Sequence, residues 1–246
     1  AAGGTLGILI PPSVIMVIYA LAAEESVPEL FAAGMIPGII LAILFVVVVW
    51  VIGRLRPDWS PTGERVPWRE RLGAALAMWK LLVLFGLAVG GIYTGWFSPT
   101  EAAGVASFAA IVIGVGTRKL NLRDTVECVS ESLLTTAMLM FIIAGAWIFA
   151  FFVVQTRVPV ALVELIEFLK LSPWAVIAVI LVFYIILGCV LDSVAIILVT
   201  VPVFLPVVIA LDYNTVWYGI LMVVVVEVGL ITPPVGLNIF VIRAQL

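Results

Sequence analysis

Long apolar runs separated by short polar segments make up most of this chain. The runs at 31–52 and 175–190 are long enough to cross or nearly cross a bilayer, which takes about 20 apolar residues. The pattern predicts a half-helix at 14–23, spans at 31–52, 100–116 and 125–155, an amphipathic helix at 158–171 and an apolar helix at 176–191. We therefore expect an all-α polytopic membrane protein.

The segment from residue 69 to residue 93 fits two arrangements. An interfacial helix would run over 69–85, with tryptophan and lysine side chains at the level of the lipid headgroups. Alternatively, 72–93 crosses the membrane outward and 100–116 returns. Either piece could instead be re-entrant, so the topology of 72–116 stays open.

Basic loops give an expected orientation. The linker at 54–71 and the loop at 118–123 carry most of the arginines, so both are placed in the cytoplasm. The acidic loop at 24–29 then lies outside.

Composition agrees with a membrane protein and excludes several chemistries. The chain is 65% hydrophobic and 11% charged, whereas a soluble domain carries about 25% charged residues. It has no histidine, which removes an imidazole base and a histidine metal ligand. No Walker motif is present, so a nucleotide-driven pump is not expected. Cys128 and Cys189 are expected to be ordinary small apolar residues.

The same unusual pattern occurs near both ends of the chain. Gly7 is followed by Pro11-Pro12, and Gly229 is followed at the same spacing by Pro233-Pro234. Each proline pair removes two backbone donors and leaves the carbonyls four residues earlier without helical partners. In a bilayer, such carbonyls persist where they are buried in protein or line a polar cavity. Two broken helices in corresponding positions predict the site of a secondary transporter.

Acidic residues inside apolar sequence are further candidates. Asp192-Ser193 follows an apolar run directly, and the sequence to Thr200 and Pro202 is apolar again, which predicts a helical hairpin that enters the membrane. An intramembrane carboxylate indicates a functional site because its burial is unfavourable. The alternative is that Asp192 only caps a helix. For Glu227 the functional and structural interpretations are equally open.

The sequence Ser98-Pro-Thr-Glu101 has the pattern of a capping box at a helix start. The structural interpretation is that Glu101 closes this helix end. The functional interpretation is that the capped end lies within the membrane and faces a site.

Four motifs, in this order along the chain, resemble the large membrane subunit of TRAP transporters, the DctM-like permeases. They are Gly4-Thr-Leu-Gly-Ile-Leu-Ile-Pro-Pro-Ser13, Phe97-Ser-Pro-Thr-Glu-Ala-Ala103, Leu191-Asp-Ser193 with Val199-Thr-Val-Pro202, and Leu230-Ile-Thr-Pro-Pro-Val-Gly-Leu-Asn238. The resemblance covers essentially the whole chain. It matches only the C-terminal part of such a subunit, and both ends of the chain look cut, so we expect a fragment of a longer permease.

The resemblance implies an elevator-type carrier with two inverted repeats, each with a re-entrant hairpin and a broken helix. On this basis 1–30 ends the first repeat, 31–93 holds a scaffold span, the cytoplasmic linker and the interfacial helix, and 94–246 is the second repeat, with its hairpin at about 188–210 and its broken helix at about 215–246. The implied sodium ligands are Gly4, Thr5, Gly7, Pro11, Asp192, Ser193, Gly229, Thr232 and Pro233. The implied substrate ligands are Ser13, Thr200, Pro234, Gly236 and Asn238.

The function that the resemblance implies is sodium-driven uptake of an organic acid anion, such as a C4-dicarboxylate or sialic acid, across the bacterial inner membrane. The expected partners are a small DctQ-like membrane subunit, a periplasmic DctP-like binding protein and the bilayer, with no nucleic acid. Sodium is the coupling ion, and no cofactor or enzymatic activity is expected. The alternatives are a sodium–dicarboxylate symporter that needs no binding protein, an intramembrane enzyme using Asp192 and Glu227 as acid and base, and a passive channel.

Overall fold

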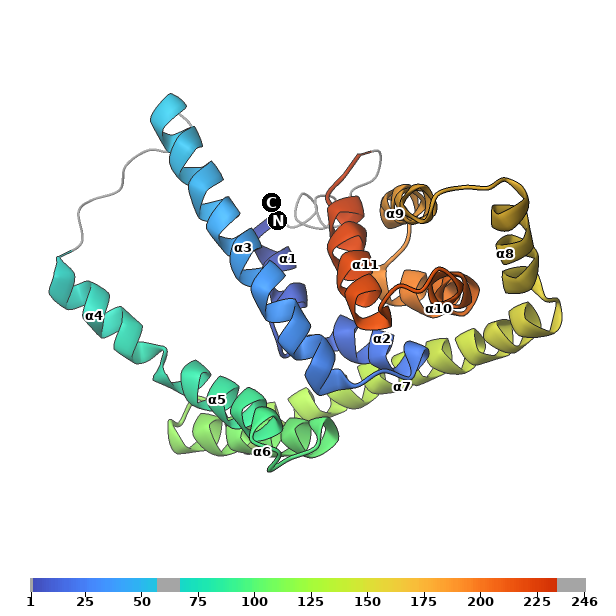
Figure 1. The fold of residues 1–246 in the computed structure, drawn as a ribbon. Helices are drawn as coiled ribbons and strands as arrows, with labels where there is room; N and C mark the ends of the chain where they lie inside the picture. Colours follow the sequence, from blue (N-terminus) through green and yellow to red (C-terminus); the bar gives the residue numbers. More distant parts are fainter. Residues whose placement is uncertain (1, 57–66, 234–246) are drawn as a thin grey trace. The chain divides into compact units, whose positions relative to one another are not determined.

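The computed structural model describes residues 2–56 and 67–233, and every regular element within these ranges is a helix (Figure 1). The helices are α1 (Ala2–Leu9), α2 (Val14–Ala23), α3 (Val27–Leu55), α4 (Trp68–Ala77), α5 (Trp79–Tyr93), α6 (Pro99–Gly116), α7 (Leu122–Gln155), α8 (Val158–Phe168), α9 (Pro173–Gly188), α10 (Ser193–Ala210) and α11 (Thr215–Leu230). The chain forms two compact units, unit 1 (1–38 and 135–246) and unit 2 (39–134).

Four of these helices, α3, α6, α7 and α10, are long and apolar enough to cross a membrane. The all-α polytopic prediction is therefore confirmed. The half-helix expected at 14–23 is α2, and the spans expected at 31–52, 100–116 and 125–155 lie within α3, α6 and α7.

The interfacial helix expected at 69–85 is shorter than the sequence indicated. The chain breaks at Met78, between α4 and α5, with a bend of 44°. The change in polarity explains the bend: Arg69, Glu70 and Arg71 favour the headgroup region, whereas α5 is almost entirely apolar. Together the two helices qualify as one bent span.

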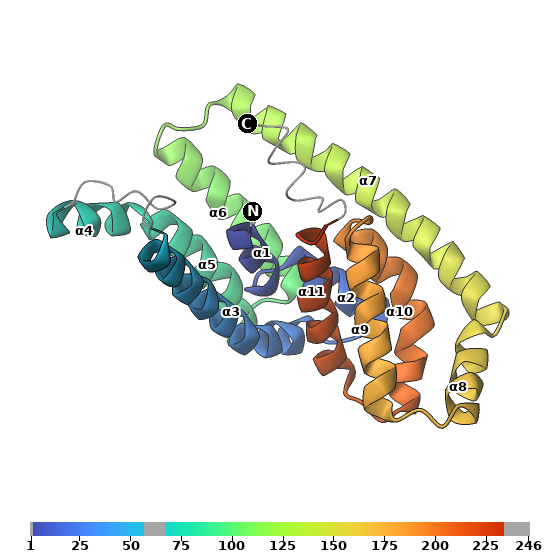
Figure 2. The same ribbon diagram turned by 90° about the horizontal axis from the view of Figure 1, so that it is seen from above.

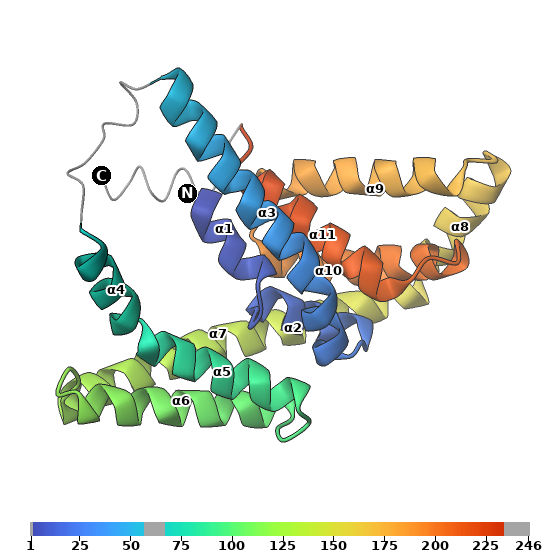
Figure 3. The ribbon, with the colours of Figure 1, turned by 60° about the vertical axis from the view of Figure 1, so that its left-hand side comes forward.

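The core of unit 1 lies where α2, α10 and α11 pack together (Figures 2 and 3). Met16 and Tyr19 of α2, Ile196 of α10 and Met222 of α11 are fully buried. Tyr19 lies against Gly219, where a side chain would overlap its ring, and its hydroxyl donates to the Thr215 carbonyl at 2.6 Å. The half-helix that leaves the first break is thus anchored on the helix that leads to the second.

The loop after α2 and the start of α11 meet at one end of unit 1. The Thr215 hydroxyl donates to the carboxylate of Glu25. Asn214 caps α11 by accepting the Trp217 N–H at 2.8 Å. Loop 24–26 and loop 211–214 are therefore on the same side of this unit.

Three hydroxyl groups connect α9, α10 and α11 inside unit 1. The hydroxyls of Tyr184 and Tyr218 are 2.6 Å apart, and the Thr200 Oγ1 lies 3.1 Å from that of Tyr184. The Thr200 hydroxyl also lies 2.7 Å from the Ile196 carbonyl. All three side chains are buried, so this hydroxyl chain satisfies polar groups that have no access to water.

In unit 2, α5 and α6 lie side by side (Figure 3). The Ser98 N–H donates to Glu101 Oε2 at 2.8 Å, and the Glu101 N–H donates to Ser98 Oγ at 3.3 Å. The capping box predicted at the start of α6 is confirmed.

Candidate functional site

α9 and α10 form a helical hairpin that turns at 189–192, next to Asp192-Ser193. It spans 173–210, which is longer than the expected 188–210, and its entry into the membrane stays a prediction. Asp192 is the N-cap of α10, where its Oδ2 accepts the Val194 N–H at 3.1 Å. The structural interpretation of Asp192 as a helix cap is confirmed. Because the side chain is exposed, its carboxylate can contact a further group while it caps the helix.

The second break begins where α11 ends at Leu230. The Thr232 hydroxyl donates to the Val228 carbonyl at 2.5 Å, and the Thr232 N–H donates to the Gly229 carbonyl at 2.9 Å. The expectation that Pro233 leaves the Gly229 carbonyl without a partner is therefore wrong. The carbonyl accepts a hydrogen bond from the N–H group three residues later, that of Thr232, instead of from position 233. A carbonyl has a second lone pair, so it still has room for a cation.

The hairpin turn and the second break lie against each other. A Cβ atom on Gly188 would lie 2.9 Å from Gly229 Cα, and one on Gly229 would lie 2.7 Å from Gly188 Cα. The Cys189 thiol lies 3.6 Å from the Pro233 carbonyl oxygen. The backbones of α9 and α11 are therefore in direct contact at this point, and the contact requires both glycines.

A carboxylate completes this meeting point. Ser193 Oγ donates to Glu227 Oε1 at 3.2 Å. We refer to Asp192, Ser193, Glu227, Gly229, Thr232 and Pro233 as the tip–break cluster. It contains every sodium ligand expected in the second half of the chain, together with Glu227, which the sequence left open.

Glu227 is the unusual member of the tip–break cluster. Its side chain is 6% exposed. Within the described ranges, Glu227 Oε2 is the one buried side-chain nitrogen or oxygen that has no hydrogen-bond partner. The signal that could have found it is a single carboxylate in the otherwise apolar run of α11.

The first break separates α1 from α2. The last backbone bond of the α1 ladder joins Ile10 N–H to Leu6 O at 2.9 Å, so the carbonyls of Gly7 and Ile8 lie beyond it, as the sequence predicted. Ser13 is buried and caps α2 by accepting the Met16 N–H at 3.3 Å.

The candidate sodium ligands of the first break, Gly4, Thr5, Gly7 and Pro11, lie on α1 and in the turn that follows it. α3 packs closely on this turn, since a Cβ atom at Gly34 would lie 3.1 Å from the Leu9 carbonyl oxygen. α1 also contacts α11 within unit 1.

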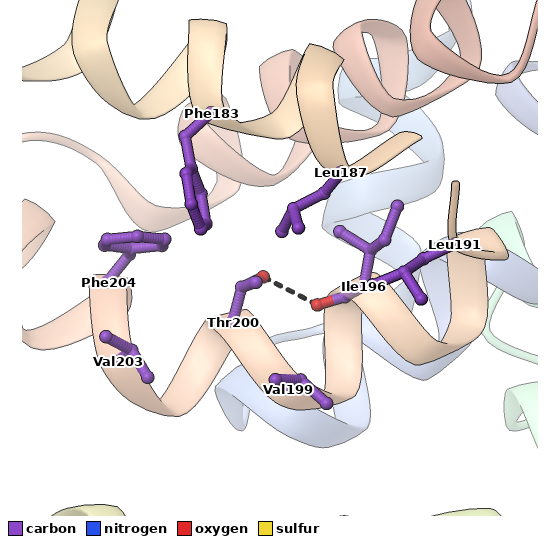
Figure 4. Close-up of a pocket in the computed structure, with 8 residues that line it drawn as sticks. All are labelled: Phe183, Leu187, Leu191, Ile196, Val199, Thr200, Val203 and Phe204. Carbon is purple, nitrogen blue, oxygen red and sulfur yellow. Dashed lines mark hydrogen bonds between the residues drawn. The ribbon is translucent and has the colours of Figure 1, made fainter. Parts of the chain in front are cut away.

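Of the candidate substrate ligands, Ser13 and Thr200 can be placed. Pro234, Gly236 and Asn238 lie outside the described residues. Thr200 lines a pocket of about 210 Å³ between α9 and α10, together with Phe183, Leu187, Leu191, Ile196, Val199, Val203 and Phe204 (Figure 4). The remaining seven side chains are apolar, and Figure 4 shows the Thr200 hydroxyl directed to the Ile196 carbonyl. A charged carboxylate has no free donor in this pocket, so a substrate contact of Thr200 stays a prediction.

Comparison with known proteins identifies the family. The sequence model of the tripartite ATP-independent periplasmic transporter DctM component matches residues 1–244. A C4-dicarboxylate TRAP transporter large permease protein DctM from Pseudomonas aeruginosa is 43% identical over 243 residues, which cover 98% of this chain and 56% of that protein.

Relatives with other printed substrates are also similar. A sialic acid TRAP transporter large permease protein SiaM from Vibrio cholerae is 31% identical, with 98% of this chain and 56% of that protein covered. An ectoine TRAP transporter large permease protein TeaC from Halomonas elongata is 33% identical, with 96% of this chain and 55% of that protein covered. This chain thus spans little more than half the length of these relatives. With four helices among its described residues that are long and apolar enough to cross a membrane, it is a multi-pass protein of the bacterial inner membrane. The chain belongs to the family of the DctM component of tripartite ATP-independent periplasmic transporters.

Proposed function

We propose that this chain forms part of a secondary carrier that takes up an organic acid anion, driven by a sodium gradient. Its family and the names of its relatives support transport of organic acids. The observation that carries the proposal is the contact between the hairpin turn and the second break, where oxygen ligands from two chain segments meet.

The tip–break cluster has the chemistry of an alkali-cation site. Its donors are carboxylates, hydroxyls and backbone carbonyls, which are the ligands of hard cations. Broken helices of transporters supply such carbonyls to sodium near the centre of the membrane. We assign one sodium ion to Asp192, Ser193, Gly229, Thr232 and Pro233.

The first break supplies a second set of oxygens. The carbonyls beyond the α1 ladder and the residues Gly4, Thr5, Gly7 and Pro11 are its proposed sodium ligands. The start of α2 presents free N–H groups next to Ser13, and helix N-termini favour anions. We assign the substrate carboxylate to Ser13, Thr200, Pro234, Gly236 and Asn238, with sodium binding raising the affinity for the anion.

The carrier that we propose works as an elevator built from two inverted repeats. It acts with a small membrane subunit and receives its substrate from a periplasmic binding protein. We propose a transporter and not an enzyme, because the family and the relatives that match this chain are transporter components.

Transport in proteoliposomes tests this function. The full-length permease with its small subunit is supplied with labelled C4-dicarboxylate, sialic acid, isethionate or ectoine, with sodium and the binding protein each present or omitted. Uptake that requires both supports the proposal and identifies the substrate. Uptake that needs sodium alone indicates a symporter without a binding protein, and uptake unchanged without sodium contradicts the proposal.

A further inference from the structure

We propose that Glu227 is itself a ligand of the cation held in the tip–break cluster and contributes Oε2. This inference rests on the proposed function for the identity of the cation as sodium. It adds a residue that the broken-helix pattern does not predict.

The first argument is the unpaired oxygen. Glu227 is 6% exposed, and among the described residues no donor of any kind reaches Oε2. An ionised carboxylate in such a place is unfavourable unless a positive charge or several donors accompany it. A bound cation supplies the missing charge at this oxygen.

The second argument is that the carboxylate is fixed in place. Oε1 accepts a hydrogen bond from Ser193, the first residue of α10. Two residues further along α11, Gly229 lies against Gly188 without room for a Cβ atom. The Ser193 bond and the Gly188–Gly229 contact thus hold α11 against the hairpin on both sides of Glu227.

The third argument is that Glu227 lies near the other proposed oxygen ligands of the cation. Its partner Ser193 follows Asp192. Gly229 lies two residues after Glu227 on α11, and Thr232 lies just beyond the end of that helix. These are the oxygen donors assigned to sodium above. Glu227 therefore joins the hairpin arm to the broken helix through one carboxylate, with Oε1 on Ser193 and Oε2 on the cation. Loss of the cation leaves the Glu227 carboxylate held through Oε1 alone.

The substitution Glu227→Gln in the full-length permease tests this assignment. It keeps the shape of the side chain and removes the charge. We expect the sodium concentration for half-maximal uptake to rise at least about tenfold, while uptake at saturating sodium stays within about twofold of the unmodified protein. Glu167→Gln removes an exposed carboxylate of α8 and is the matched control, for which no change is expected.

A binding measurement gives a second readout without transport. Sodium should raise the melting temperature of the purified permease when it replaces choline, and this shift should be reduced in Glu227→Gln but not in Glu167→Gln. If Glu227→Gln does not insert into the membrane, Glu227→Asp replaces it, and a raised half-maximal sodium concentration is again expected.

The outcomes separate this inference from the proposed function. Sodium-dependent uptake with an unchanged half-maximal concentration and an unchanged melting shift in the variant would overturn the role of Glu227 and leave sodium coupling intact. Uptake by the unmodified permease that ignores sodium would instead overturn the proposed function.

Discussion

The Asp192 side chain combines two tasks that substitutions can separate. It caps α10 through the Val194 N–H, and its carboxylate stands next to Ser193 at the hairpin turn. Asparagine caps helices about as well as aspartate, whereas alanine does not. The charge and the cap are therefore testable one at a time.

Replacing Asp192 by Asn should keep the cap and weaken the cation site. We expect Asp192→Asn to insert normally and to keep its melting temperature in the absence of sodium, but to need more sodium for half-maximal uptake. Asp192→Ala should in addition lose about 1 kcal/mol of stability with the cap. An Asn variant with unchanged sodium dependence would restrict Asp192 to its capping role.

At Gly229, adding a single methyl group should lower both the stability and the sodium affinity of the permease. In Gly229→Ala the new methyl group would lie 2.7 Å from Gly188 Cα, so α9 and α11 must move apart. Overpacking of this kind costs about 1–3 kcal/mol, and we expect both a lower melting temperature and weaker sodium binding. Gly104→Ala in α6 is the control, because nothing lies within 4 Å of the added atom. A Gly229→Ala protein as stable as that control would contradict the close contact.

At the scale of helices, local signals predicted where elements begin and end. The proline pair marked the start of α2, Ser98 to Glu101 that of α6, and Asp192-Ser193 that of α10. The loop expected at 24–29 is shorter, because α3 begins at Val27. Each signal acts within a few residues, through a missing N–H or a capping side chain. Such signals are readable in a sequence without knowledge of the fold.

The contacts between helices could not be predicted from local sequence signals. The Ser193–Glu227 bond, the Gly188–Gly229 contact and the bond between Tyr184 and Tyr218 join positions more than thirty residues apart. They depend on how two helices cross, which the residues near each position do not determine. For this reason the sequence named the candidate ligands of the second break, which the structure brings into one region, but left Glu227 open, and it missed the bond that Thr232 makes to the Gly229 carbonyl.

Removing a proline from the second break should extend α11. Pro233→Ala restores an N–H group that can bond to the Gly229 carbonyl, which now accepts from Thr232. We expect the variant to be at least as stable as the unmodified permease without sodium, yet to bind sodium more weakly, because the break is straightened. Sodium titrations monitored by melting temperature would show this. Full sodium affinity in the variant would exclude the break as a source of ligands.

At the scale of the whole molecule, the contact between Thr215 and Glu25 constrains the topology. It places loop 24–26 and loop 211–214 on one side of unit 1. The distribution of arginines assigns the acidic loop to the periplasm and the loop at 118–123 to the cytoplasm. The loop between α10 and α11 should therefore be periplasmic as well.

Cysteine labelling in whole cells tests this topology. In a permease whose native cysteines are replaced, we expect Asp212→Cys to react with a membrane-impermeant maleimide in intact cells. Lys119→Cys should react only after the membrane is opened. Equal labelling of the two positions in intact cells would contradict the assigned orientation.

The hydroxyl chain of Tyr218, Tyr184 and Thr200 has a consequence for motion. It crosses from α11 through α9 to α10 in a layer without water, where a broken hydrogen bond finds no replacement. Sliding any of these three helices past the others would require such a break, so the layer resists shear and keeps its internal distances. Deformation is then easier at the hairpin turn at 189–192 than within this layer. The hairpin turn, which carries the proposed ion ligand Asp192, is thus joined to a layer that resists shear.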